Sequence, residues 1–153
     1  MIHLQKSFSW YLFVLGLVYL AVSLWPASFW LRVESIYVHS ANVGEQPRME
    51  VRRTIKRPFQ AEWRVELERK VGDSYVFVTR AHGSNFYATD SKIPDPLFLD
   101  WWTYPKVMDI RPGIYRLETC WTIQADAPFP EKSVCFVSND FNVFPNVARG
   151  DRR

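Results

Sequence analysis

Residues 59–68 read Phe59-Gln60-Ala61-Glu62-Trp63-Arg64-Val65-Glu66-Leu67-Glu68. Every odd position is apolar and every even position is polar or charged. This period of two is typical of a strand that packs one face on a core and turns the other face to water. Such half-buried strands belong to antiparallel sheets, because parallel sheets are covered on both faces. The stretch therefore predicts an antiparallel, all-β domain.

Similar patterns on both sides of this stretch predict further strands. The turn residues Gly72-Asp73-Ser74 predict a hairpin whose returning strand is 75–79, followed by a loop at 81–85. Either Tyr75 and Phe77 or Val76 and Val78 would face inward. The remaining strands are expected at 35–39, 49–55, 115–124 and 133–137, the last continuing through 141–143 after a bulge. Roughly seven short strands in one domain favour a β-sandwich over residues 33–146.

One corner of this sandwich carries a resemblance. The run Pro112-Gly113-Ile114-Tyr115-Arg116-Leu117 resembles the corner before the sixth strand of immunoglobulin-like and fibronectin type III domains. The resemblance implies that the Tyr115 hydroxyl bonds back to the corner backbone and that Trp63 is the inner-sheet tryptophan. The chain departs from true immunoglobulin domains because its second strand has no cysteine. The resemblance concerns the fold and implies no specific function.

The N-terminal segment has a different pattern. Residues 7–31 hold 25 consecutive residues without a charge, about 37 Å as a helix, which is enough to cross a hydrocarbon core of roughly 30 Å. Trp10 and Trp30 lie near its two ends, where aromatic rings favour the membrane interface. We therefore expect a transmembrane signal-anchor helix at 7–31, after a short cytoplasmic tail at 1–6. A cleavable signal peptide ending near Ala21-Val22-Ser23 is the alternative.

The complete expectation is an all-β, immunoglobulin-like antiparallel β-sandwich preceded by one transmembrane α-helix. The sandwich at 33–146 would be followed by a disordered basic tail at 147–153. Through residues 7–31 the chain would be anchored in a membrane, which is its first expected partner.

The two cysteines suggest on which side of the membrane the domain lies. If the last two strands pair with Cys120 opposite Cys135, then Trp121 faces Val134 and Thr119 faces Phe136. This register collects the apolar residues on the core side and places both cysteines on the solvent side. A disulfide there is expected outside a reducing cytosol. We therefore expect a periplasmic or extracellular domain behind a cytoplasmic N-terminus; two unpaired structural thiols are the alternative.

Charge and motifs exclude several functions. Of 19 Lys and Arg residues only Lys6 and Arg32 precede residue 33, so 17 basic residues face 16 acidic ones in the rest of the chain, which disfavours a nucleic-acid partner. No nucleophile elbow, zinc-protease motif, phosphate loop or dinucleotide fingerprint is present, so we expect neither an enzyme nor a cofactor or metal. Asp90, Asp95 and Asp100 leave an envelope-polymer hydrolase as the least favoured alternative.

Two groups of residues are candidate binding sites. The first is the aromatic loop with Trp101, Trp102 and Tyr104, where one tryptophan could enter the core while the other forms a platform for a sugar ring or a partner side chain. A loop that merely covers the open end of the sandwich is the alternative.

The second candidate is a basic cluster that would bind anionic headgroups or acidic polysaccharide. Its members are Arg48, Arg52, Arg53, Lys56 and Arg57. The alternative is a solvated strand face, balanced by Glu62, Glu66 and Glu68 on a neighbouring strand. We expect from both candidates a non-catalytic binding module with a protein or glycan partner. A structural accessory subunit of a membrane complex is the alternative.

Overall fold

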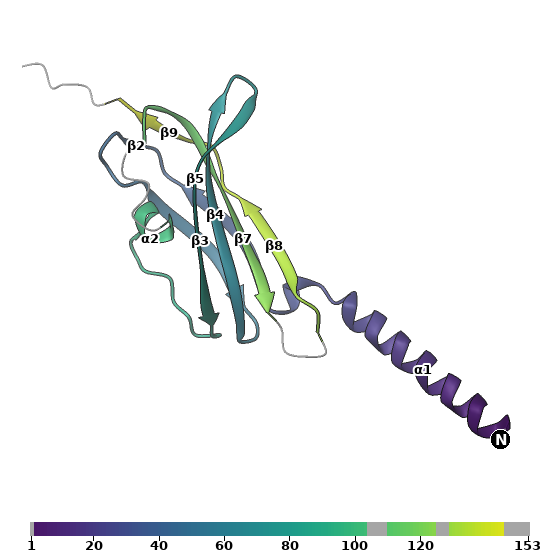
Figure 1. Cartoon of the computed structure of the whole chain (residues 1–153). Coiled ribbons are helices and arrows are strands. Elements are labelled where there is room, and N and C mark those ends of the chain that lie inside the picture. Colours follow the sequence, from purple (N-terminus) through teal and green to yellow (C-terminus); the bar gives the residue numbers. More distant parts are fainter. Residues whose placement is uncertain (1, 104–109, 125–128, 146–153) are drawn as a thin grey trace, which may run out of the picture.

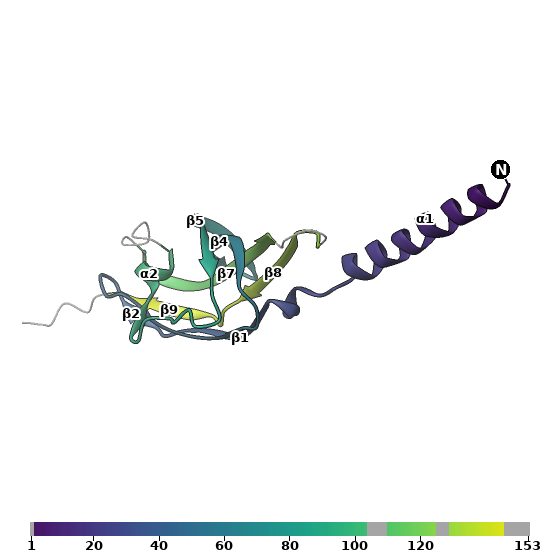
Figure 2. The same cartoon turned by 90° about the horizontal axis from the view of Figure 1, so that it is seen from below.

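Two sheets packed face to face form the body of the protein, and all but one of the described strand pairs are antiparallel (Figures 1 and 2). The computed structural model describes residues 2–103, 110–124 and 129–145, and the side chains from residue 10 onward. The first sheet has the order β1-β3-β6. Its strands are β1 (Leu31–Val38), β3 (Arg48–Ile55) and β6 (Leu97–Phe98).

The second sheet is larger and has the order β2-β9-β7-β4-β5, with β8 also paired to β7. Its strands are β2 (Ala41–Asn42), β9 (Phe141–Phe144), β7 (Gly113–Gln124), β4 (Phe59–Val71), β5 (Ser74–Tyr87) and β8 (Lys132–Val137). The parallel pair is β2 with β9. β8 and β9 follow one another along the same edge of β7. The predicted continuation of the last strand after an interruption is thus confirmed.

The core lies between the sheets and follows the alternation seen in the sequence. Ala61, Val65 and Leu67 of β4 are buried, as are Leu117 and Ile123 of β7. Each fully buried side chain of Val or Leu size contributes about 1.5–3 kcal/mol relative to exposure. The inward rows of β4 and β7 therefore contribute strongly to stability, and they also position the inward side chains discussed below.

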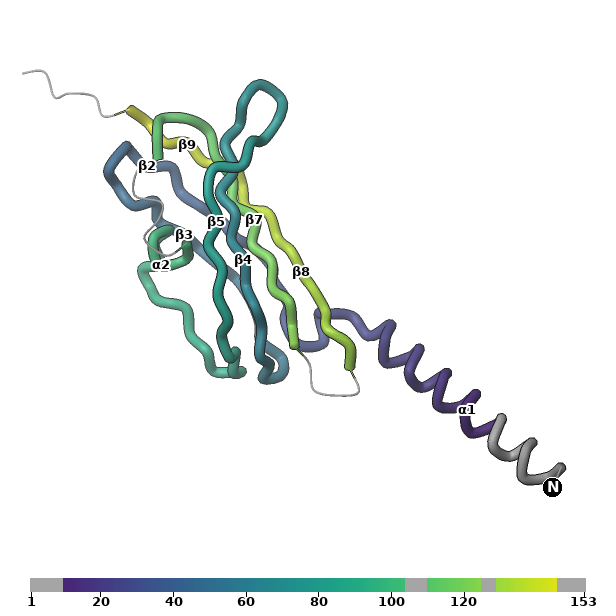
Figure 3. Tube along the Cα trace, in the orientation of Figure 1, coloured from purple at the N-terminus to yellow at the C-terminus, as the bar shows by residue number. Residues whose placement is uncertain are grey.

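β5 is longer than its sequence indicates. The loop expected at 81–85 is wrong, because β5 continues in register with β4 through Tyr87. Near the turn the register shifts after Leu67, and Val76, Phe77 and Val78 are all exposed. Neither of the two inward faces considered for this strand is buried. The hairpin tip projects past the rest of the sandwich, so no second sheet covers it (Figures 1 and 3).

The corner before β7 has the hydrogen bond that its sequence implied. The Tyr115 hydroxyl donates to the backbone carbonyl of Arg111 at 2.7 Å, which ties the start of β7 to the turn before it. In the break between β8 and β9, Ser138 bonds both backbone groups of Leu117. These bonds satisfy backbone groups where the regular ladder is interrupted.

The structure corrects the helix that was expected at 7–31. α1 (Ile2–Ser23) ends well before Leu31, and the single-turn helix η1 (Ala27–Phe29) leads into β1. Trp30 and Leu31 are only 5% and 1% exposed, because they belong to the core of the sandwich. The uncharged run is therefore shared between a helix and a β-domain. No helix in the described part of the chain is long and apolar enough to cross a membrane, so the expected transmembrane helix is wrong.

Candidate functional site

A cavity of about 630 Å³ lies between the two sheets, where the connection from β5 to β6 and the short helix α2 (Leu99–Thr103) approach β4 and β7. Its lining is mostly apolar and rich in aromatic residues. The residues are Arg53, Trp63, Val65, Asn85, Tyr87, Pro94, Pro96, Phe98, Asp100, Trp101, Trp102, Thr119 and Trp121. A volume of this size is within the range of small-molecule sites, about 300–1,000 Å³.

Strand alternation explains why these side chains meet. Trp63 and Val65 occupy inward positions of β4, and Thr119 and Trp121 occupy inward positions of β7. Trp63 is directly opposite Trp121 in the ladder. Both indoles line the cavity.

Hydrogen bonds fix the aromatic walls. The Trp121 indole N–H donates to the Tyr87 hydroxyl at 3.2 Å. The Trp102 indole N–H donates to the Thr119 hydroxyl at 3.0 Å, and both residues are buried. The Trp102 and Trp121 rings meet edge to face at 6.2 Å between centroids. Because each of these indoles has a hydrogen-bond partner, these parts of the cavity wall are held in place.

Arg53 is the one basic residue among the described residues of the lining. Its guanidinium carbon lies 5.2 Å from the centroid of the Tyr87 ring and 5.9 Å from that of Trp102. Its Nε is buried, and the described residues offer it no hydrogen-bond acceptor and form no ion pair with the guanidinium. Burial lowers the pKa of Arg53, against an opposing effect of Tyr87. Burial also raises the pKa of the Tyr87 hydroxyl.

The aromatic loop divides as the sequence suggested, although it is helical. Trp102 is buried in the core, whereas Trp101 is 54% exposed. Both indoles line the cavity, with ring centroids 6.2 Å apart. Tyr104, the third predicted residue, lies outside the described residues. Trp102 therefore packs in the core, and both tryptophans form part of the cavity wall.

The basic cluster does not form one patch. Arg53 points inward, while Arg48 and Arg52 occupy the opposite face of β3, with Arg48 3.7 Å from Asp95. Lys56 and Arg57 follow the strand and are exposed, and the Arg57 guanidinium lies 3.9 Å from the centroid of the Phe29 ring. Charge alone could not separate these residues, but parity on β3 separates Arg53 from Arg48 and Arg52.

The glutamates considered as partners of this cluster lie elsewhere. β3 pairs with β1 and β6, not with β4. Glu66 instead contacts Arg64 and Arg80, and Glu68 contacts Arg116. The basic residues of β3 therefore do not pair with glutamates on a neighbouring β4, as the alternative required.

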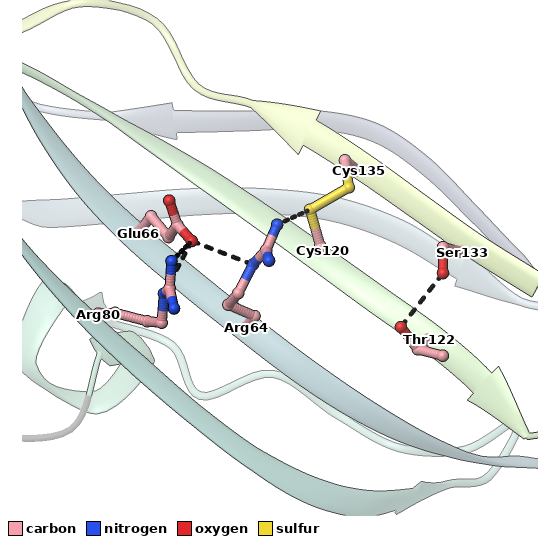
Figure 4. The surroundings of a disulfide bond; sticks show 7 residues. All are labelled: Arg64, Glu66, Arg80, Cys120, Thr122, Ser133 and Cys135. Atoms are coloured by element: carbon pink, nitrogen blue, oxygen red, sulfur yellow. Dashed lines mark hydrogen bonds and ion pairs between the residues drawn. A yellow bond between two sulfur atoms is a disulfide. The ribbon is translucent and has the colours of Figure 1, made fainter. Parts of the chain in front are cut away.

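Cys120 and Cys135 form a disulfide across β7 and β8 in the predicted register. Arg64 Nη2 lies 3.7 Å from the Cys120 sulfur, and the Glu66 carboxylate forms ion pairs with Arg64 and Arg80 (Figure 4). Cys135 is exposed, whereas Cys120 is buried. The pair thus lies on the outer face of the sheet, away from the cavity.

The carboxylates considered for hydrolysis do not gather at the cavity. Asp100 lines it, and its carboxylate accepts the backbone N–H of Trp101 at 2.7 Å. Asp95 instead pairs with Arg48. Asp100 is the single carboxylate that the described lining contains, whereas glycoside hydrolysis uses two facing ones.

Local sequence pattern does not indicate that several other residues line this cavity, namely Trp63, Asn85, Tyr87, Thr119 and Trp121. One signal was available for Arg53: it shares its strand parity with Met49, Val51 and Ile55, which are all apolar. A charge at an inward position is unusual and indicates either a paired core group or a site.

Comparisons with protein-family models, with curated proteins and with solved structures find no match to this chain.

Proposed function

We propose that this protein is a non-catalytic binding module that receives an apolar or aromatic ligand group in the cavity between its sheets. The observation that carries the proposal is the cavity itself, with four tryptophans, a tyrosine and a few polar groups around about 630 Å³. Binding sites commonly combine a mostly apolar concave wall with a small number of convergent polar groups. The bonded indoles reduce the ordering that a ligand must induce.

The finer fold assignment is also a proposal: an immunoglobulin-like sandwich. Strands β1, β3 and β6 would correspond to strands A, B and E of that fold, and β9, β7, β4 and β5 to G, F, C and C′. The bond from Tyr115 to the Arg111 carbonyl supports this correspondence. In this assignment Trp63 occupies strand C and lines the cavity instead of packing on a disulfide.

We propose an oxidising compartment for the domain, periplasmic or extracellular. The disulfide with its exposed Cys135 supports this location, because such a bond is reduced in most cytosols. The test is alkylation of intact cells with a membrane-impermeant thiol reagent, before and after reduction. Labelling from outside only after reduction is expected, whereas labelling without reduction and only after lysis would place the domain in the cytoplasm.

The binding proposal can be tested with resonances that report on the site alone. The chain has seven tryptophans, of which Trp63, Trp101, Trp102 and Trp121 line the cavity. The other three, Trp10, Trp25 and Trp30, precede β1 and serve as internal controls. The full chain is labelled with 5-fluorotryptophan, and Trp→Phe variants assign the fluorine resonances. Titration with three neutral probes (the amides of biphenyl-4-carboxylic, 2-naphthoic and indole-3-acetic acids) should shift the four cavity resonances saturably.

A matched pair of variants separates the cavity from adventitious apolar contact. Trp101→Ala removes an aromatic side chain that lines the cavity and is 54% exposed. Phe77→Ala removes an aromatic side chain of the hairpin tip that is almost equally exposed, at 53%. The probes should bind several-fold more weakly to Trp101→Ala and unchanged to Phe77→Ala. If no probe shifts the cavity resonances, or if all seven move together, the cavity is not a binding site.

A further inference from the structure

We propose that the ligand is a small organic anion, an aromatic or otherwise apolar body bearing one carboxylate, and that Arg53 binds the carboxylate inside the cavity. This inference rests on the proposed binding function and names the chemical class of its ligand. Three observations carry it: the position of Arg53, the state of its donors and the apolar character of the surrounding walls.

The first observation is that Arg53 is placed inward on a strand whose other inward residues are apolar. Met49 and Ile55 are buried on the same face of β3. An arginine in this row is removed from much of its water, which is unfavourable for a cation unless a partner compensates. The described residues supply no carboxylate within ion-pair distance. Among the described residues, the compensation comes from the faces of Tyr87 and Trp102 and from a hydrogen bond with the Tyr87 side chain, and none of these supplies a full negative charge.

The second observation is an unused donor. The Nε–H of Arg53 is buried and has no acceptor among the residues that the structure describes. Native proteins leave few buried polar groups unsatisfied, so each such group calls for an explanation. Nε and one Nη of a guanidinium form a fork that matches the two oxygens of a carboxylate. A carboxylate in the cavity would supply both the missing charge and the missing acceptor.

The third observation concerns the rest of the lining. Trp63, Trp121 and Val65 offer apolar surface, so the ligand needs an apolar body in addition to its charge. Asp100 is the one group of the described lining that opposes an anion, and it is partly exposed and bonded to the Trp101 N–H. Its charge should be screened by water more than that of Arg53 is.

The test compares each probe acid with its amide, which has the same body without the charge. The pairs are biphenyl-4-carboxylate, 2-naphthoate and indole-3-acetate against the three amides named above, titrated at pH 7 with the fluorine resonances of the cavity tryptophans as readout. We expect at least one acid to bind about tenfold or more tightly than its amide, the ratio typical of a hydrogen-bonded charge pair. If amides shift the cavity resonances and every ratio is below tenfold, the anion proposal is overturned while the binding proposal stands. If neither acids nor amides shift them, both are overturned.

Variants of Arg53 identify the group responsible. Arg53→Met keeps the length and removes the charge, so the preference for acid over amide should fall to about onefold while amide binding persists. Arg53→Lys keeps the charge without the fork and should retain only part of the preference. Unshifted resonances of Trp25 and Trp30 show that a variant is folded. If these resonances show that Arg53→Met does not fold, Arg53→Lys alone tests the role of Arg53. An unchanged preference in both variants would overturn the assignment of Arg53.

A further variant separates this role from general electrostatics. Asp100→Asn removes the opposing charge and leaves Arg53 in place, so acid binding should strengthen or stay constant. The same change is not expected to alter amide binding. Loss of acid binding in Asp100→Asn would contradict the proposed arrangement, because it would mean that the acidic side chain, and not Arg53, organises the site.

Discussion

The indole of Trp63 lies directly on the backbone of Gly83, its partner on β5: a Cβ added at position 83 would be only 2.6 Å from Cζ2 of Trp63. This contact places a large side chain flat on one wall of the cavity. The absence of a side chain at position 83 therefore helps to determine the shape of the site.

Gly83→Ala should reduce the cavity without touching a ligand directly. The new methyl group must displace the Trp63 ring, which costs about 1–3 kcal/mol of stability as overpacking does. The Trp63 fluorine resonance should move and probe affinity should fall several-fold. His82→Ala, on the opposite, exposed face of the same strand, is the control. An unmoved Trp63 resonance together with unchanged affinity would contradict this steric role.

Thr119→Val tests the bonded walls. The change leaves the buried indole N–H of Trp102 without an acceptor, so the free energy of unfolding should fall by about 1–3 kcal/mol. In a Trp102→Phe background the same change should cost less, because the donor is already gone. Urea unfolding of the four proteins in this cycle gives the coupling energy, expected at about 0.5–3 kcal/mol. Additive losses would show that the bond contributes nothing.

Replacing both Cys120 and Cys135 by Ser tests the disulfide. The bond closes a segment with a sequence separation of 15, which corresponds to about 3 kcal/mol in the chain-entropy model. The neighbouring cross-strand pair Thr122 and Ser133, whose hydroxyls are 3.2 Å apart, is the matched control. Its replacement by two alanines should cost about 0.2–1 kcal/mol. Equal losses in the two double variants, measured by urea unfolding, would assign no special role to the disulfide.

Stability should fall at alkaline pH because of Tyr87. Burial raises the pKa of its hydroxyl above the ordinary value of 10.0, so the unfolded chain releases this proton first. Between the two pKa values the folded state holds more protons, and the free energy of unfolding decreases as pH rises. The stabilising effect is fully present below about pH 10 and is lost as pH rises through the folded pKa.

The measurement is urea unfolding between about pH 9 and 11, in wild type and in Tyr87→Phe, whose slope should be smaller. Thiol exchange does not interfere, because both cysteines of the chain are in the disulfide. Tyr37→Phe, at an exposed position of β1, is the control. Equal slopes for wild type and Tyr87→Phe would show that another group causes the loss.

Local pattern predicted much of the sandwich because its physical cause is local. The alternation at 59–68 became β4, and the alternation at 115–124 became most of β7. The register that set Cys120 opposite Cys135 was also predictable, since a slip by one residue would have turned Trp121 to solvent. The length of β5 was not predictable, because Gly83 and its neighbours weaken strand propensity and only pairing with β4 overrides it.

The predicted end of the N-terminal helix was wrong for a related reason. An unbroken apolar run does not indicate where a helix ends and where core residues of the next domain begin. Trp30 and Leu31 are apolar because they pack in the core of the sandwich. Pro26 was the available signal, since it lies between α1 and the turn that leads to β1.

The sequence by itself determined the all-β character of the domain, the central strand and the cysteine register, because strand period and register depend on the order of residues along the chain. Only the tertiary structure decided the site. Arg53, Trp63, Tyr87, Trp102 and Trp121 come from five separate elements or connections, and they meet only because two sheets pack face to face. Packing between sheets sets which inward side chains fill the core and which enclose a cavity, and that outcome depends on distances that no local pattern contains.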